Sequence, residues 1–365
     1  MLSRRQAGSY VWQASQFEFE DVIAQVDDVL LLTPDAQPAG PARAVLHGAA
    51  NRARKALGRP RRSALRPPSA TIDAELFFAV FAHPHEIGAL PHVRDQLARS
   101  RVKVAFIVEL WTTEVDGVAD YLRQLRGFDH IFLFSRGAIP AVERITGVPC
   151  TYLPTAVDTA LFAPPTPDGA RCIDVSSYGR RLPETHDALL DAMAAGDIYY
   201  HYDTVHGAFQ VTGHREHRAA LAAMLRRSRY SVVYRNNDDP GRTARTGGEE
   251  SLTNRYFEVL AAGAVMLGSA AETSDFEDCF GWTDAVVPLR APAPDVMTVI
   301  ETVERDGDRR DRASRAGIVE CLRRHDWAHR WRDVLAVAGV PERPQLGRRL
   351  DELEALARRH EASPT

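Results

Sequence analysis

Lysine is almost missing from this chain. Of its 45 Lys and Arg residues, only Lys55 and Lys103 are lysines, and the abundance of Arg and Ala indicates a GC-rich, bacterial genome. No Lys lies beyond residue 103. A phosphate-binding site in the second half of the chain must therefore use Arg, whose guanidinium group binds phosphate oxygens as a bidentate fork.

Cysteine and long apolar runs are also scarce. The four cysteines are far apart and show no CxxC or CxxxC spacing, which argues against a disulfide framework or a zinc site and favours buried free thiols (Cys150, Cys172, Cys279 and Cys321). No stretch is long enough to span a membrane, and the first 21 residues lack the apolar core of a signal peptide. We therefore expect a cytoplasmic protein.

Acidic residues are missing from one segment. Residues 36–71 contain no Asp or Glu but eight Lys or Arg residues, which lie between Arg43 and Arg66. A solvated loop or surface helix is the interpretation we favour for 43–66. The alternative is an electropositive face for an anionic acceptor or a membrane surface. For the whole chain, a net charge of −4 points to no polyanionic partner such as nucleic acid.

The 365 residues form two predicted domains. Buried apolar runs alternate with helical patterns up to about residue 160, and the alternation starts again near 171. This rhythm predicts parallel strands joined by crossover helices, hence an α/β protein with two doubly wound, Rossmann-like halves. We expect an N-terminal domain over 1–162, a second domain over 170–324, and C-terminal helices over 325–365, the first packing back on the N-terminal domain.

Two carboxylates mark the most informative segment, residues 247–269. Glu250 and Glu258 have seven residues between them and flank the start of a short amphipathic helix. A carboxylate accepts hydrogen bonds from two vicinal hydroxyls, and the amides at a helix N-terminus receive a diphosphate, so this segment suits a sugar nucleotide. An ordinary strand–loop–helix–strand unit is the structural alternative.

A turn with two arginines precedes it. In SSYGRR (176–181), Gly179 lets the backbone approach a ligand, and Arg180 or Arg181 could stabilise a diphosphate leaving group. A turn with solvated arginines explains the same residues.

Candidate bases follow two strands of the first half. His83 and His85 come directly after the strand predicted at 76–83, and Glu109 ends the strand predicted at 103–110. Ligand sites lie beyond such strand ends, so each could act as a general base; for Glu109, a solvated carboxylate is equally plausible. His-Pro-His also hints at a metal, but we predict none because no third ligand has a suitable spacing.

The order of these segments resembles the C-terminal half of a GT-B glycosyltransferase, and more narrowly the glycosyltransferase group 1 or family 4 type. The similarity rests on the interdomain segment YLPTAVDTALFAP (152–164), the GRR turn, and TNRYFEVLAAGAVMLGS (253–269). It covers residues 150–335, whereas residues 1–140 agree only in the alternation of predicted strands and helices. It implies two Rossmann-like domains facing an interdomain cleft, with a nucleotide-diphosphate sugar as co-substrate and no separate cofactor.

The resemblance also implies roles for individual residues. Glu258 should hold the ribose hydroxyls and Glu250 should face the transferred sugar. Arg180 or Arg181 should bind the diphosphate, and backbone amides should lie near the sugar and phosphates (Thr253, Asn254 and Arg255). The structural alternative for Glu258 is an ion pair with Arg255, three positions before it.

Three departures from the family pattern matter. The Lys that often assists the phosphate-binding Arg has no counterpart, although a long loop before Glu250 offers Arg235, Arg242 and Arg245. An N-terminal Gly-rich loop that often meets the acceptor is not visible. The single D-x-D of the chain, 306–308, lies among exposed charges away from any strand end, so we predict a solvated turn and no dependence on a metal.

The sequence therefore predicts a hexosyl- or related transferase acting on an unidentified acceptor, such as a natural product, a glycan or an envelope precursor. The spacing of the two glutamates favours retention of anomeric configuration; an inverting enzyme would need a base such as His83, His85 or Glu109. A GT-B-fold sugar-nucleotide epimerase and a non-catalytic sugar-nucleotide-binding protein are the alternatives.

Overall fold

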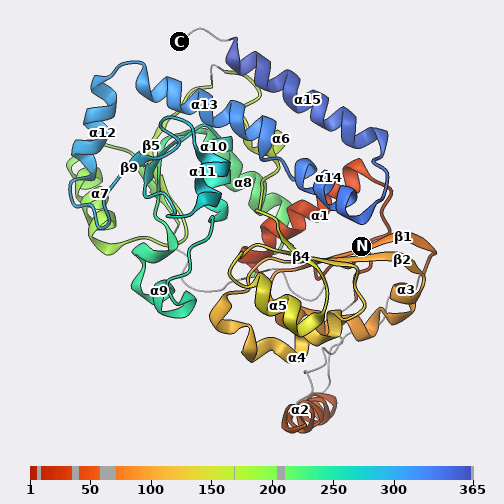
Figure 1. Ribbon diagram of the computed structural model, residues 1–365. Helices are drawn as coiled ribbons and strands as arrows, with labels where there is room; N and C mark the ends of the chain where they lie inside the picture. The colour runs from red at the N-terminus through yellow and green to blue at the C-terminus, as the bar shows by residue number, and fades with distance from the viewer. Residues whose placement is uncertain (6–9, 35–40, 58–70, 168, 204–209, 363–365) are drawn as a thin grey trace. The chain divides into compact units, whose positions relative to one another are not determined.

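The computed structural model describes residues 1–5, 10–34, 41–57, 71–167, 169–203 and 210–362. The chain divides into two compact units. The first comprises Met1–Pro154 and Trp331–Arg343, and the second comprises Thr155–Arg330 and Pro344–Thr365. Each contains one parallel sheet flanked by helices, as the alternating sequence pattern predicts (Figure 1). Among the described residues no helix is long and apolar enough to cross a membrane.

The first unit is built on a four-stranded parallel sheet of order β1-β2-β3-β4. Its strands are β1 (Ala74–Phe81), β2 (Ser100–Ile107), β3 (His130–Leu133) and β4 (Cys150–Tyr152). The paired run from Leu76 to Phe81 is almost wholly apolar because both faces of the sheet are covered.

Helices cover both faces of this first sheet. Phe19 of α1 (Ala14–Val26) packs edge-on against Phe78 and Phe106, with ring centroids 5.9 and 6.5 Å apart. The opposite face carries Phe77 and packs with α4 (Ala119–Leu122) and α5 (Ile139–Thr146). Part of α14 (Trp327–Ala338) belongs to this unit, where Trp331 lies 5.3 Å from Phe78, centroid to centroid.

The remaining elements of the first unit are short. A 3-10 helix, η2 (Pro84–His92), and α3 (Arg94–Ala98) connect β1 to β2. The sequence of residues 85–100 indicates a connection followed by a helix, and the structure has this order, with Pro91 inside the 3-10 segment. The basic segment forms α2 (Pro41–Ala56), but residues 58–66 of that prediction lie outside the described part of the chain.

The second unit has a five-stranded parallel sheet of order β6-β5-β7-β8-β9. The strands are β5 (Ile173–Ser177), β6 (Tyr200–Tyr202), β7 (Ser228–Val233), β8 (Val265–Gly268) and β9 (Val287–Pro288). Chain order reverses at β5, because the next strand lies on one side of it and the following strand on the other. Ligands of doubly wound sheets bind beyond the carboxyl ends of the strands at such a switch point.

The helices of the second unit connect and flank these strands. Their bounds are α6 (Thr159–Phe162), α7 (Pro183–Ala195), α8 (His214–Arg226), α9 (Pro240–Thr246), α10 (Asn254–Ala261), α11 (Ser274–Phe280), α12 (Val296–Arg305), α13 (Arg309–Arg324) and α15 (Pro344–Glu361). Helices α10 and α13 pack closely at Gly317, where an added Cβ would lie 3.1 Å from the Leu260 carbonyl oxygen. This packing fixes α10 on the sheet, and α10 carries Glu258.

Candidate donor site of the second unit

The site lies at the switch point of the second sheet. Strand β5 ends at Ser177 and is followed by Tyr178 to Arg181, while β7 ends at Val233 and is followed by Tyr234 to Asn236. Arg255 ties these two strand ends to α10: its Nη1 donates to the Arg180 carbonyl (3.3 Å) and its Nη2 to the Tyr234 carbonyl (3.2 Å). The turn after β5, the end of β7 and the first turn of α10 thus meet around one buried guanidinium.

Glu258 is almost fully buried, with 4 % of its surface exposed. Its Oε2 accepts a hydrogen bond from the Tyr178 hydroxyl at 2.8 Å, and its Oε1 forms an ion pair with the guanidinium of Arg218 from α8. Burial, reinforced by the carboxylate of Glu258, raises the pKa of Tyr178 well above its usual value, so the hydroxyl stays a donor. The carboxylate is therefore held in one orientation by two donors.

The local structural alternative for Glu258 was an ion pair with Arg255. Within the described residues Glu258 pairs instead with Arg218, which lies 40 positions earlier in the chain. Arg218 is itself 4 % exposed, and its guanidinium carbon lies 4.7 Å from the centre of the Phe162 ring. A buried pair of this kind is costly to assemble, so it fixes geometry more than it adds stability.

Glu250 lies in the loop before α10, and its side chain is 7 % exposed. Its Oε1 accepts a hydrogen bond from the backbone amide of Asn237 at 3.3 Å and lies 3.7 Å from Arg235 Nε. Its Oε2 is buried and has no hydrogen-bond partner among the described residues. Burial raises the pKa of this carboxyl group above its usual value. An unpaired buried oxygen is costly, and a hydroxyl of a ligand would satisfy it.

The two arginines of the turn have different environments. Arg181 forms an ion pair with Asp203, which also accepts a hydrogen bond from the Gly179 amide at 2.9 Å. Gly179 itself has φ +72°, a left-handed conformation that favours glycine at this turn. Arg180 donates to Asn236 Oδ1 at 2.8 Å and lies 3.7 Å from Asp239.

Positive charge accumulates around Arg180. Burial, together with the nearby charges of Arg255 and Arg242, lowers the pKa of Arg180 to about 10. The group remains protonated near neutral pH, but an anion would relieve this repulsion. Helix α10 starts at Asn254, and Thr253 is its N-cap residue. The side chain of Thr253 makes no capping hydrogen bond to the first turn of the helix. This concentration of cations beside a helix N-terminus suits a phosphate group.

The loop arginines of the prediction also differ. Arg235 is neutralised by Asp238, Glu250 and Glu272, with the first of these 3.2 Å from its Nε. Arg242 lies on α9 and contributes to the positive field at Arg180 and Arg255. Arg245 lies in the last turn of α9.

Comparison with known families supports a glycosyltransferase. Residues 180–336 match the family model described as glycosyl transferase-like, a span that includes Arg180, Arg218, Glu250 and Glu258. A similar solved structure is an alpha-glucosyltransferase in complex with UDP and a 13-mer DNA containing an HMU base, at 10 % identity and a TM-score of 0.53. The match covers 93 % of this chain and 98 % of that one. Residues 180–336 are thus similar to glycosyl transferase-like proteins, and the chain as a whole has a fold like that of this glucosyltransferase.

Other solved structures resemble this chain more weakly. Anabaena Alr3699/HepE in complex with UDP-glucose gives a TM-score of 0.47 at 9 % identity, over 96 % of this chain and 98 % of that chain. The N-terminal domain of Candida albicans trehalose-6-phosphate phosphatase gives 0.43 at 9 % identity, over 84 % and 78 %. No curated protein matches the chain. At these identities the structural likeness concerns the fold alone.

The first unit of the chain contains the candidate bases. His83 precedes η2, and its ring stacks on that of His85, with the two Nδ1 atoms 2.7 Å apart. The His85 ring also meets Tyr121 edge-on at 4.9 Å. The backbone amide of Glu109 donates to the Ala82 carbonyl at 3.0 Å, so this residue lies beside the end of β1. The structure therefore brings His83, His85 and Glu109 to one edge of the first sheet.

Sequence reasoning missed an acid at the same edge. Glu86 accepts hydrogen bonds from the Ala82 amide at 2.7 Å and from Gln13 Nε2 at 2.6 Å. Burial raises the pKa of Glu86, partly offset by the charge of Arg4. The residue follows the two histidines directly in HPHE, but no spacing rule distinguished it from a surface carboxylate.

In the second unit, sequence reasoning missed Tyr178 and Arg218. Tyr178 lies in the SSYGRR turn, where only the glycine and the arginines were predicted to have a role. Arg218 shares the buried face of α8 with Ala222 and Leu225. A cation at a core position of an amphipathic helix was the available signal, because a buried Arg needs a buried acid.

The described residues contain no group of three or more His, Cys, Asp or Glu side chains placed to hold a metal ion. Asp306 and Asp308 lie in the turn between α12 and α13, where Asp306 pairs with Arg312 at 3.3 Å. Among the cysteines, Cys172 is exposed, which corrects the prediction that all four thiols are buried.

Proposed function

We propose that this glycosyltransferase transfers a sugar from a nucleotide-diphosphate sugar, with UDP as the nucleotide, to an acceptor hydroxyl. The observation that carries the proposal is the buried carboxylate of Glu258, oriented by Tyr178 and Arg218 next to the cationic start of α10. The alpha-glucosyltransferase of similar fold was solved with UDP, which supports the choice of nucleotide.

Glu258 is proposed to hold the ribose. A carboxylate offers about four lone-pair sites, of which Tyr178 and Arg218 use two. The remaining sites accept hydrogen bonds from the two vicinal ribose hydroxyls. The buried Arg218 and the Tyr178 hydroxyl hold the carboxylate in one orientation.

The diphosphate is proposed to lie between Arg180 and the first turn of α10. Arg181 is a weaker candidate because Asp203 already neutralises it. Arginine and helix amides stabilise the charge that develops on the leaving diphosphate, so we propose catalysis without a metal or other cofactor. Transfer that persists in excess EDTA would support this part of the proposal, and loss of activity that Mg²⁺ restores would refute it.

Glu250 is proposed to contact the transferred sugar through its unpaired Oε2. This places an acceptor of hydrogen bonds, rather than a nucleophile, at the sugar. We propose transfer with retention, with the leaving phosphate deprotonating the acceptor. A product of inverted configuration, measured by NMR of its anomeric proton, would overturn this and require His83, His85 or Glu109 as the base.

The acceptor is proposed to be a small molecule or glycan and not a nucleic acid, consistent with the net charge of −4. The structurally similar alpha-glucosyltransferase was solved with DNA, so duplex DNA belongs in the acceptor panel. Transfer of labelled sugar to DNA would contradict this part of the proposal.

Thermal unfolding with a panel of nucleoside diphosphates and their sugars tests the proposal. A ligand at 100 times its dissociation constant should stabilise the chain by about 2.7 kcal/mol, a shift of several degrees. We expect such a shift with UDP and a UDP-sugar. The central claim fails if no nucleoside diphosphate raises the melting temperature. Donor turnover without acceptor would indicate an epimerase, and binding without turnover under any acceptor a non-catalytic protein.

A further inference from the structure

The helix α2 (Pro41–Ala56) belongs to no part of the proposed donor site, and its surface is unusual. Apolar residues recur at 45, 46, 49, 50, 53, 56 and 57, a spacing that gathers them on one face of a helix. Every one of these seven positions is exposed. By contrast, three positions outside this face are only partly exposed (Gly48, Asn51 and Arg54).

Three large side chains dominate this apolar face. Val45, Leu46 and Leu57 are 67, 69 and 71 % exposed, the highest values among the large exposed apolar residues of the described chain. A surface helix of a soluble protein normally turns such a face toward the core. Here the face is turned toward the solvent, which indicates a surface intended for contact with something else.

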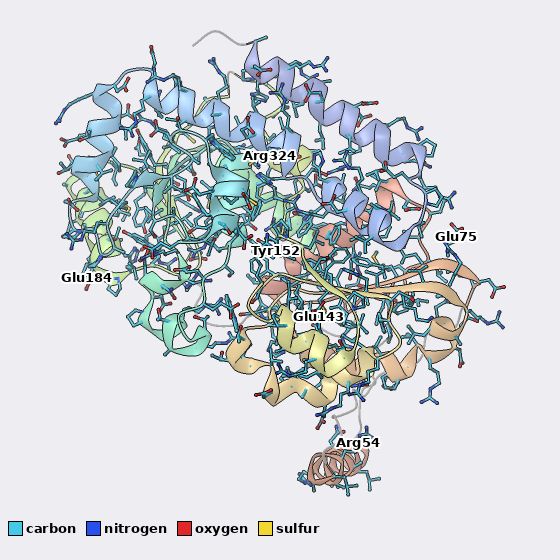
Figure 2. All side chains as sticks on the ribbon, viewed as in Figure 1. Arg54, Glu75, Glu143, Tyr152, Glu184 and Arg324 are labelled. Atoms are coloured by element: carbon cyan, nitrogen blue, oxygen red, sulfur yellow. The ribbon has the colours of Figure 1, made fainter. Side chains whose placement is uncertain are left out.

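Basic residues flank the apolar face. Arg52 and Arg54 lie on α2, with the side chain of Arg54 labelled in Figure 2, and the sequence around them contains no acid from residue 36 to residue 71. Arginine stems can lie along an apolar surface while the guanidinium groups reach an anionic layer. The sequence alone favoured a solvated surface helix. That interpretation gives no reason for Val and Leu side chains to be exposed to water.

We propose that α2 is a membrane-surface helix that binds anionic lipid bilayers, with Val45, Leu46 and Leu57 inserted at the headgroup boundary and the arginines on the anionic headgroups. A basic amphipathic helix with an apolar face of this size binds weakly to neutral lipid and gains most of its affinity from anionic lipid. Nucleic acid shares the negative charge, but it offers no apolar layer for these three side chains.

Sedimentation with vesicles tests this with the full chain. We expect binding to vesicles of phosphatidylcholine containing about one-third phosphatidylglycerol, weak binding to pure phosphatidylcholine, and release as the salt concentration rises. The variants L46E/L57E and R52E/R54E should each lower the partition coefficient about tenfold or more. The readout is independent of sugar transfer, so it can fail or succeed whatever becomes of the proposed function.

Matched controls separate the helix from general effects of charge. R94E/R101E makes the same change of charge at two exposed positions of the first unit outside α2, and Val337→Glu alters an apolar residue that is 47 % exposed on α14. These variants should bind vesicles like the unaltered chain. Equal losses in the controls would refute a specific role of α2.

Two further outcomes would overturn the proposal. If L46E/L57E lowers the melting temperature by many degrees, the apolar face packs inside the protein. If the chain binds duplex DNA through Arg52 and Arg54 and no vesicle of any composition, the helix is a nucleic-acid contact. An unchanged melting temperature together with lost vesicle binding is the result that supports a lipid-binding face.

Discussion

The two units of this chain each contain an Arg–Glu pair with a buried carboxylate, and the two pairs differ in their surroundings. In the first unit Arg5 Nη2 lies 2.7 Å from Glu20 Oε2, and the pair joins α1 to the N-terminal segment that runs parallel to β1 from Leu2. In the second unit the pair of Arg218 and Glu258 lies where β5 and α10 meet, at the reversal of strand order. The difference indicates that one pair supports packing and the other a ligand site.

The partners of the two glutamates sharpen this contrast. Glu20 is bonded by Ser3 and Arg5, and Arg5 also reaches Asp21 at 2.9 Å, so the first pair joins the N-terminal segment to α1. Glu258 is bonded by Tyr178, whose neighbours Gly179 and Arg180 form the predicted phosphate turn. The second pair lies in the unit where Arg180, Arg242 and Arg255 place their positive charges close together. The following predictions test whether the two pairs have separate roles.

The largest effect is expected from removing the two glutamates. Glu258→Ala removes the ion-pair partner of the buried Arg218, which costs about 3–5 kcal/mol of stability. Glu20→Ala should cost less, because Arg5 keeps its ion pair with Asp21. Glu258→Ala should also weaken UDP binding about 100-fold, because charged hydrogen bonds contribute about 1.5–3 kcal/mol each. Glu20→Ala should leave the affinity of the folded protein for UDP unchanged. Chemical unfolding and calorimetric titration measure the two quantities.

Conservative variants separate folding from binding. Tyr178→Phe removes one hydrogen bond to Glu258 and keeps the ring, so it should weaken UDP binding modestly with a small loss of stability. If Glu258→Ala and Glu20→Ala weaken UDP binding equally, the division between a structural pair and a ligand-binding pair is wrong.

The second effect is a dependence of stability on pH. Burial raises the pKa of Glu20 to about 7 from its ordinary 4.5. The folded state therefore binds this proton more tightly than the unfolded state, so its stabilising effect is complete below pH 4.5 and is lost as the pH rises to about 7. The loss amounts to about 3 kcal/mol. Unfolding measured from pH 4.5 to pH 8 should show this decline in the unaltered chain and not in Glu20→Gln. A Gln variant with the same decline would assign it to another group.

The predictability of the two units from sequence differed for physical reasons. Strands such as β1 and β2 are buried on both faces, so their apolar runs were visible as runs. The turn at Gly179 and the acids at Glu250 and Glu258 were visible because they are local patterns. The ion pair of Glu258 was not, because its partner Arg218 is 40 positions away and only the fold brings them together.

The segment around residue 90 was predictable only in outline. Its sequence indicates a connection followed by a helix over 85–100, and the structure has a 3-10 segment that contains Pro91, followed by one short helix. The capping of the 3-10 segment by His83 was not predicted. In the same way, the burial of Glu86 depends on Gln13 and on the end of β1, which no local pattern contains. The sheet rhythm followed from local hydrophobicity, whereas the hydrogen-bond partners required the tertiary structure.

The third effect compares the two arginines of the turn. Arg180→Ala should weaken UDP binding by about 2 kcal/mol, or roughly 30-fold, whereas Arg181→Ala should have a much smaller effect because Asp203 already neutralises that charge. Binding of uridine, which has no phosphate, should be insensitive to Arg180→Ala. Equal effects on UDP and uridine would show that Arg180 acts through the fold of the turn and not through the diphosphate.

The smallest effect concerns Glu250 and the pH dependence of transfer. Burial raises the pKa of this carboxyl group, and the anionic form is the better acceptor of a hydrogen bond from the sugar. Activity, measured as kcat/KM for the donor, should therefore rise with pH as Glu250 loses its proton, and the rise should begin above the ordinary pKa of a glutamic acid. Glu250→Gln should remove this acidic limb and lower kcat/KM at neutral pH about tenfold, while the UDP affinity stays unchanged because UDP lacks the sugar. The corresponding variant Glu354→Gln, at a partly exposed acid paired with Arg323, should retain the acidic limb and the activity. An acidic limb that persists in Glu250→Gln would place the titrating group elsewhere, and a loss of UDP affinity would move Glu250 from the sugar to the nucleotide.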